Sequence, residues 1–252
     1  MKKLLVLCIA AIIGVTATLA QEEPIPPPRR VKAPKVGLFG GYTPAWLNVD
    51  VTEVNTFLQG TGAGSLSDGG IFMNGGAGAI YILVVPNLRV GGMGMGGGIS
   101  SSQLDPATNI RRDVEMSVGL GGVTVEYVVN IVPRLDVAFG TMIGWGGVDL
   151  TLRADSGGSN TWTGESTWFR DWPRGPWTNS TRTLSGSYFA LVPAVNVEYA
   201  VLGWLALRVG ASYTAMLFPS WQVDGKYDLL NVPDGVNGNG FMINGGILVG
   251  TF

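Results

Sequence analysis

From residue 36 onward the sequence is a series of apolar, glycine-punctuated segments, joined alternately by tight turns and by long polar loops. Eight segments have the composition of β-strands and cover residues 36–47, 70–84, 88–102, 114–130, 134–152, 184–201, 204–218 and 240–252. Tight turns follow the second, fourth and sixth segments, at 85–87, 131–133 and 202–203. Long loops lie at 48–69, 103–113, 153–183 and 219–239. This asymmetry is typical of an antiparallel up-and-down barrel that spans a membrane.

The composition agrees with a barrel that presents apolar side chains to lipid. Only 13% of the residues are charged, the mean hydropathy is positive, and 39 residues are glycine. After residue 20 there is no apolar run long enough to form a transmembrane helix. The sequence therefore predicts an all-β protein, an eight-stranded antiparallel up-and-down transmembrane β-barrel, over residues 36–252.

The N-terminal residues read as a secretory signal followed by a tether. Lys2 and Lys3 precede an uncharged run that is too short to span a bilayer, and small residues follow it. We expect a signal peptide over residues 1–20, cleaved near Ala20. The proline-rich segment 21–35 reads as a periplasmic tether. Removing the signal also removes Cys8, the lone cysteine, so no disulfide is expected.

Strict alternation of large apolar with small or polar residues is clear in segments 134–152, 184–201 and 204–218. The large apolar residues are expected to face lipid and the others the lumen. In segment 114–130 the alternation changes phase, which predicts a β-bulge near Gly121 and Gly122.

Aromatic residues fall at two levels along the predicted strands. Tyr81, Tyr127 and Tyr199 each lie shortly before a tight turn, whereas Trp145 and Tyr213 lie further along strands that begin at such turns. Amphipathic rings settle at the two interfaces of a bilayer, so these levels predict its boundaries.

The last segment, FMINGGILVGTF at 241–252, ends in an aromatic residue. With this end, the strand count and the turn asymmetry, the chain after residue 35 resembles the small outer-membrane barrels of the outer membrane protein A and X type. Gly250 stands where that family usually has a second aromatic residue. The resemblance implies a bacterial outer-membrane location, contact with outer-membrane lipid, and insertion by the barrel-assembly machinery.

Five charged residues near the tight turns are predicted to point into the lumen, namely Arg89, Glu126, Asp136, Glu198 and Arg208. Adjacent strands should bring Arg89 near Glu126, Glu126 near Asp136, and Glu198 near Arg208. Unpaired charges in a narrow lumen are costly, so these groups should form ion pairs. They form either an ionic plug that fills the inner half of the barrel or a charge gate that passes ions.

The loop 153–183 combines aromatic and basic residues: Trp162, Trp168, Phe169, Arg170, Trp172, Arg174 and Trp177. Aromatic faces beside guanidinium groups are suited to sugars and to anionic groups such as lipopolysaccharide phosphates. Alternatively, the rings pack on one another, cap the barrel and rest among lipid headgroups.

Catalysis has little support in the sequence. The chain has no histidine and no cysteine beyond the predicted signal, which excludes a Ser-His triad and the usual imidazole or thiolate metal sites. No cofactor or metal is expected, and a net charge of −2 argues against nucleic acid. We predict a non-enzymatic outer-membrane barrel, structural or surface-interacting through its long loops. The alternatives are a narrow channel for small solutes or ions, and a secreted soluble barrel that binds an apolar ligand.

Overall fold

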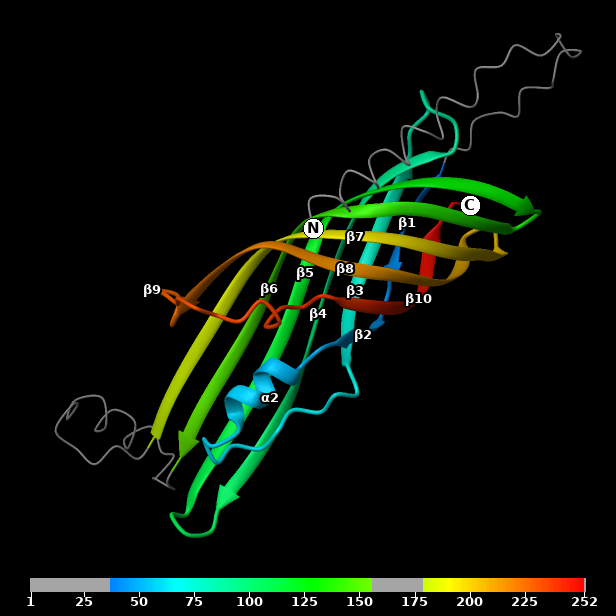
Figure 1. Ribbon diagram of the computed structural model, residues 1–252. Helices are drawn as coiled ribbons and strands as arrows, with labels where there is room; N and C mark the ends of the chain where they lie inside the picture. The colour runs from blue at the N-terminus through cyan, green and yellow to red at the C-terminus, as the bar shows by residue number, and fades with distance from the viewer. Residues whose placement is uncertain (1–36, 156–178, 252) are drawn as a thin grey trace, which may run out of the picture. The chain divides into compact units, whose positions relative to one another are not determined.

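The computed structural model describes residues 37–155 and 179–251, in which one antiparallel sheet closes on itself as a barrel (Figure 1). Its strands are β1 (Leu38–Tyr42), β2 (Ala45–Val49), β3 (Ile71–Tyr81), β4 (Leu88–Asp105), β5 (Ile110–Val132), β6 (Leu135–Asp155), β7 (Asn179–Leu202), β8 (Leu205–Val223), β9 (Tyr227–Asp228) and β10 (Gly240–Gly250). A short helix, α2 (Thr52–Leu58), follows β2. No helix in this part of the chain is long and apolar enough to cross a membrane.

The ring contains eight strands, which confirms the predicted architecture. β1 and β2 are two halves of one barrel strand, because each pairs with β3 on one side and with β10 on the other. The interruption falls at Thr43 and Pro44, where proline lacks an N–H for the ladder. β10 also pairs with β8, which closes the ring. The predicted signal (1–20) and tether (21–35) lie outside the described residues.

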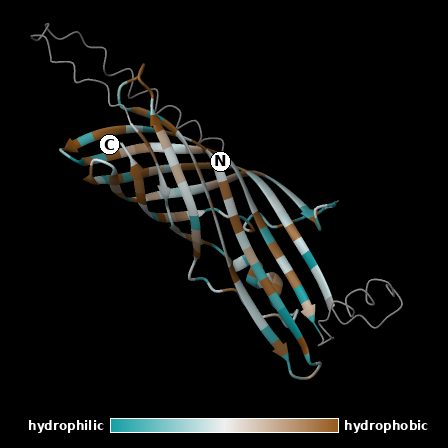
Figure 2. Ribbon diagram, turned by 180° about the vertical axis from the view of Figure 1, so that it is seen from behind, coloured by the Kyte–Doolittle hydropathy of each residue, from teal (hydrophilic) through white to brown (hydrophobic). Residues whose placement is uncertain are grey.

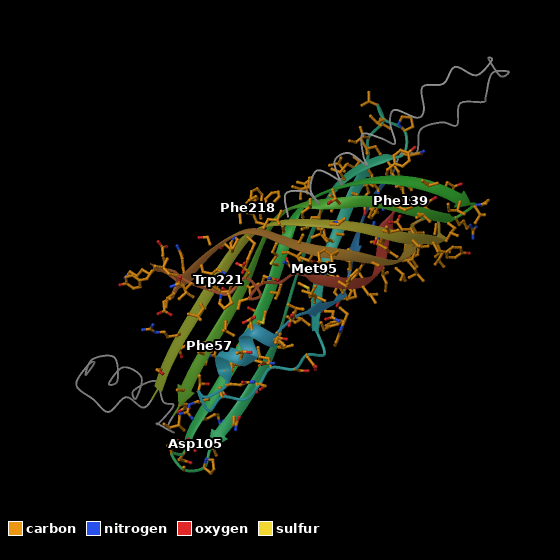
Figure 3. All side chains as sticks on the ribbon, viewed as in Figure 1. Phe57, Met95, Asp105, Phe139, Phe218 and Trp221 are labelled. Carbon is orange, nitrogen blue, oxygen red and sulfur yellow. The ribbon has the colours of Figure 1, made fainter. Side chains whose placement is uncertain are left out.

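The connection between β4 and β5 differs from the prediction. The expected loop 103–113 is mostly strand, and the chain reverses over residues 106–109 alone. Asp105 closes this turn by accepting hydrogen bonds from the Thr108 hydroxyl (2.7 Å) and the Ala107 N–H (2.9 Å), which hold its pKa below the usual range. Asn109 adopts a positive φ of 54°, and Figure 3 shows Asp105 at the tip of this hairpin.

The barrel strands are unequal in length, and this divides the barrel into two zones. β4 to β8 contain 18 to 24 residues each, whereas β3 and β10 contain 11. The long strands therefore continue past the ends of β3 and β10 (Figure 1). We call this continuation the outer extension; it consists of residues 98–105, 110–118, 147–155, 179–187 and 215–223. The rest of the barrel, in which all eight strands form the closed ring, is the inner zone.

The apolar residues change sides where the inner zone meets the outer extension. On β5, Val123 and Val125 are exposed on the outer surface, whereas Val114, Met116 and Val118 are buried inside. The register with β4 and β6 runs without a shift through Gly121 and Gly122, so the predicted bulge there is wrong. The phase changes because the apolar side chains of the outer extension turn inward, not because the strand is kinked.

The outer extension has an apolar core of its own. Buried residues of β5 and β6 pack in one cluster with Val54 and Leu58 of α2. The loop that carries α2 is fixed by Asn55, whose side chain donates to the Leu66 carbonyl (3.0 Å) and accepts from its N–H (2.8 Å). From the opposite loop, the Val236 carbonyl accepts a hydrogen bond from the Tyr188 hydroxyl (2.8 Å). Residues 50–70 and 224–239 thus cover this core.

On the outer surface of the inner zone, exposed apolar side chains form a belt around the barrel. Figure 2 shows hydrophobic residues, in brown, along the strands of this zone. The belt includes Leu38, Ile80, Val123, Val125, Phe139, Ile143, Val195, Val197, Leu207, Val209, Ile243, Ile247 and Val249. Beyond it, the outward residues of β5 and β6 are polar, among them Glu115, Ser117, Asp149, Thr151 and Arg153. The belt is therefore a distinct zone rather than a general property of the surface.

Aromatic residues bound the belt at both ends. At the outer end they form three pairs across neighbouring strands, with centroids 5.4 to 6.5 Å apart: Trp46–Phe72, Trp145–Phe189 and Tyr213–Phe241. At the inner end Tyr127, Tyr199 and Trp204 are half exposed. On β7, Phe189 and Tyr199 are separated by a height of about 25 Å for a tilted strand, which matches the apolar band of a membrane barrel. The inner zone is a transmembrane barrel.

Tyr81 is an exception to the predicted aromatic levels. It is buried in the lumen with Val128 and Ala138, and it is 8% exposed. Its neighbour Ile80 takes the outward position. The prediction failed because the glycine-rich β3 gave no secure phase.

The belt can be tested by placing a charge at two heights on β7. Val195→Arg puts a guanidinium near the middle of the belt and should destabilise the barrel by about 2–4 kcal/mol. Ser187→Arg, on the same strand beyond the aromatic level, should cost less than about 0.5 kcal/mol. Urea unfolding in lipid vesicles measures both free energies. Equal costs for the two variants would contradict the proposed membrane boundary.

Candidate functional site

Four charged side chains meet in the lumen of the inner zone. Arg89, which is 1% exposed, donates from Nε to Glu126 (2.6 Å) and from Nη1 to Glu198 (2.7 Å), while its Nη2 donates to the other Glu198 oxygen. Arg208 Nη2 lies 2.6 Å from Glu198 Oε1 and 3.7 Å from Glu126 Oε2. Two positive and two negative charges therefore neutralise one another, and we call this group the charge cluster.

The strand register explains how the charge cluster forms. Arg89 lies directly opposite Glu126 on β4 and β5, and Glu198 lies directly opposite Arg208 on β7 and β8. These are two of the neighbour relations expected from the sequence. Inward-pointing side chains from the two strand pairs then meet across the narrow barrel.

Asp136 is not part of the charge cluster. The register places Gly140, rather than Asp136, opposite Glu126, so the expected proximity of the two carboxylates is wrong. Asp136 lies next to the 133–134 turn, opposite Asn130 of β5, and accepts a hydrogen bond from Asn130 Nδ2 (2.8 Å). The prediction treated nearness to a turn as nearness in space, whereas pairing depends on the register.

Uncharged side chains, which the sequence did not assign to this site, complete the charge cluster. The Phe39 ring lies 4.9 Å from the Arg89 guanidinium and 5.3 Å from that of Arg208, within the range of cation–π attraction. Asn196 donates to Glu126 Oε1 (3.2 Å) and accepts from Asn244 (3.1 Å). Phe39 and Asn244 belong to the glycine-rich first and last barrel strands, where the sequence alone did not fix which residues face inward.

On the outer side of the charge cluster, the lumen is filled by an apolar layer rich in methionine. Its buried side chains, all at most 7% exposed, come from six strands: Leu47, Met73, Met95, Leu120, Met142 and Met242. Met95 is labelled within the barrel in Figure 3. Methionine suits such a layer because its unbranched chain fills irregular gaps. The inner zone is thus filled at two successive levels, first by paired charges and then by the methionine layer.

The aromatic and basic residues predicted as a contact surface all lie between residues 156 and 178, outside the described part of the chain. They are Trp162, Trp168, Phe169, Arg170, Trp172, Arg174 and Trp177. The strands that carry this loop end in the pair Asp155 and Asn179. On β6, Asp155 lies roughly 25 Å beyond Trp145 in the outer aromatic level, for a tilted strand. The structure therefore holds the base of the loop well away from the apolar belt.

Comparisons with known proteins give fold-level likenesses. No family model matches the chain, and no curated protein matches it. A major outer membrane protein from Thermus thermophilus is 11% identical with a TM-score of 0.42, covering 85% of this chain and 98% of its own. The Ail attachment invasion locus protein of Yersinia pestis is 10% identical with a TM-score of 0.34, and the match covers 84% of this chain and 97% of the Ail chain. The outer membrane protease OmpT from Escherichia coli is 11% identical with a TM-score of 0.35, and the match covers 87% of this chain and 97% of the OmpT chain.

Removing Arg89 tests the energetics of the charge cluster. Arg89→Met leaves two buried carboxylates with one arginine, and we expect a loss of about 3–5 kcal/mol in the free energy of unfolding. Arg89→Met combined with Glu198→Met keeps the cluster neutral and should cost less than the single substitution. Urea unfolding in lipid vesicles gives both values. A double variant that is less stable than the single one would contradict mutual neutralisation as the reason for this arrangement.

Proposed function

We propose that this chain is a non-enzymatic protein of the bacterial outer membrane whose role lies in its outer surface, as a structural or surface-interacting barrel. The observation that carries the proposal is the outer extension, with its own apolar core and polar outer face beyond the lipid belt. A membrane anchor alone would not require this second core. The extension serves as a support that holds loops away from the lipid surface.

The proposed contact surface is the loop between β6 and β7. Its sequence places Trp168 and Trp172 beside Arg170 and Arg174, a combination suited to sugars and to lipopolysaccharide phosphates. The loops 50–70 and 224–239 pack against the outer extension through α2 and Val236. This leaves the β6–β7 loop as the long loop that is proposed to bind ligands. Packing of the aromatic residues into a cap is the competing role for the β6–β7 loop.

The route to the membrane belongs to the same proposal. A secretory signal at residues 1–20, cleaved near Ala20, would export the chain, and the barrel-assembly machinery would insert it. The proline-rich segment 21–35 would then be a periplasmic tether. The short turns 82–87, 133–134 and 203–204 all lie at the end of the barrel opposite the outer extension, as expected for periplasmic turns.

A narrow channel is the second candidate function, because charged residues line the inner half of the lumen. Two filled levels of the lumen argue against a channel. The first is the charge cluster, in which both glutamates are paired, and the second is the methionine layer. An eight-stranded barrel is only wide enough for its own side chains. We therefore favour the ionic plug over the charge gate.

Planar-bilayer recording distinguishes the plug from the gate. We expect no reproducible discrete openings from purified protein, because an ion would have to cross both filled levels. Heat-modifiable gel mobility of the same sample is the control that the barrel is folded. Reproducible unitary openings would overturn the proposed non-conducting role and support the channel.

Aromatic substitutions in the loop test the surface role. Trp168→Ala combined with Trp172→Ala should weaken binding to purified lipopolysaccharide roughly tenfold, through loss of stacking area. Trp204→Ala, which removes a half-exposed ring at the inner end of the belt, is the control and should leave that affinity unchanged. Unchanged affinity together with lower thermal stability in the loop variant would instead identify these rings as a cap.

A further inference from the structure

A small cavity of about 30 Å³ lies in the middle of the lumen, between the charge cluster and the methionine layer. We call it the chamber. Its polar wall includes Thr43, Glu126, Asn196, Arg208 and Ser212. Its apolar wall includes Met93, Met95, Met142 and Met242. The chamber is thus lined both by hydrogen-bonding groups and by thioethers.

Besides Arg208 Nη2, three polar atoms of the chamber-lining residues have no hydrogen-bond partner among the described residues. They are Thr43 Oγ1, Ser212 Oγ and Arg208 Nε, and their residues are 2%, 6% and 5% exposed. Arg208 Nη2 is close to Glu198 Oε1, at 2.6 Å, but lies off the direction of a hydrogen bond. A buried polar atom without a partner is costly, and native proteins satisfy almost all such atoms with protein groups or ordered water.

We propose that the chamber is a binding site for ordered water that completes the hydrogen bonding of Thr43, Ser212 and Arg208. A volume of about 30 Å³ accommodates roughly two water molecules, and a buried water typically makes two to four hydrogen bonds. Water both donates and accepts, so it serves the arginine N–H as well as the two hydroxyl groups.

The charge balance favours water over an ion. The charge cluster contains two arginines and two glutamates in contact, so the chamber faces no net charge that an ion would neutralise. An anion would be placed near Glu126, which itself lines the chamber. A cation would be placed near Arg208. Neutral water avoids both repulsions.

The water site makes the two arginines inequivalent. Arg89 donates from Nε, Nη1 and Nη2 to carboxylate oxygens of Glu126 and Glu198. Arg208 relies on the chamber for part of its hydrogen bonding. Arg89 is therefore the fixed centre of the charge cluster, and Arg208 is its hydrated member.

Hydroxyl-deleting variants distinguish a hydrated chamber from a dry one. Thr43→Val and Ser212→Ala remove partners of the bound water, so the urea midpoint of unfolding in lipid vesicles should fall for each. Thr214→Val is the matched control, because Thr214 Oγ1 is also buried and without a hydrogen-bond partner among the described residues, but Thr214 does not line the chamber. Its midpoint should stay the same or rise. If Thr43→Val and Ser212→Ala both behave like Thr214→Val, the chamber is dry and the proposal is wrong.

Crystallography of the full barrel identifies the occupant. We expect two water peaks within hydrogen-bonding distance of Thr43 Oγ1 and Ser212 Oγ, and no anomalous peak in the chamber after soaking with bromide or silver(I). A bromide peak beside Arg208 would overturn the proposal in favour of a halide site. A silver peak beside the methionine sulfurs would overturn it in favour of a soft-cation site. Featureless density in the chamber at high resolution would overturn it as well.

Discussion

The change of surroundings along the barrel axis, from lipid around the inner zone to water around the outer extension, determines most of this structure. In lipid, every backbone polar group must be satisfied within the protein, which a closed ring achieves. Apolar side chains then belong outside and polar ones inside. Beyond the outer aromatic level water is the solvent again, and the apolar side chains of the same strands turn inward. β5 shows both arrangements in one uninterrupted strand, with Val125 facing lipid and Val118 facing the core.

The outer extension has a second requirement, because β3 and β10 end where it begins. Five long strands without a closed ring leave an open apolar face, which would be exposed to water if nothing covered it. α2 and the loop 224–239 provide the cover, through Val54, Leu58 and Val236. The loops 50–70 and 224–239, which the sequence marks as surface features, therefore have a structural role. A chain that needed only to cross the membrane would have no use for this arrangement.

The sequence predicted the features that depend on local composition and on strand order. Strand number and turn asymmetry follow from the segment pattern, and the pair Glu198–Arg208 follows from the short turn that joins β7 to β8. The pair Arg89–Glu126 follows from the strand order, because both residues lie near the same end of neighbouring strands. The sequence-based prediction failed where the strand register or the surrounding solvent determines the structure. The 106–109 turn was missed because polar strand residues resemble a loop, and Asp136 was misplaced because its distance from a turn does not give its cross-strand partner.

Phe39, Asn196 and Asn244 show why the lumen was harder to predict than the belt. A lipid-facing side chain needs only to be apolar, so its type and its position in the alternation identify it. A lumen side chain must fit groups from strands far apart in the sequence: Phe39 contacts arginines of β4 and β8, and Asn244 reaches Asn196 of β7. Such contacts depend on the diameter and stagger of the closed ring, which no single segment encodes. The same dependence makes the charge cluster a property of the whole ring, since its four charges come from four different strands.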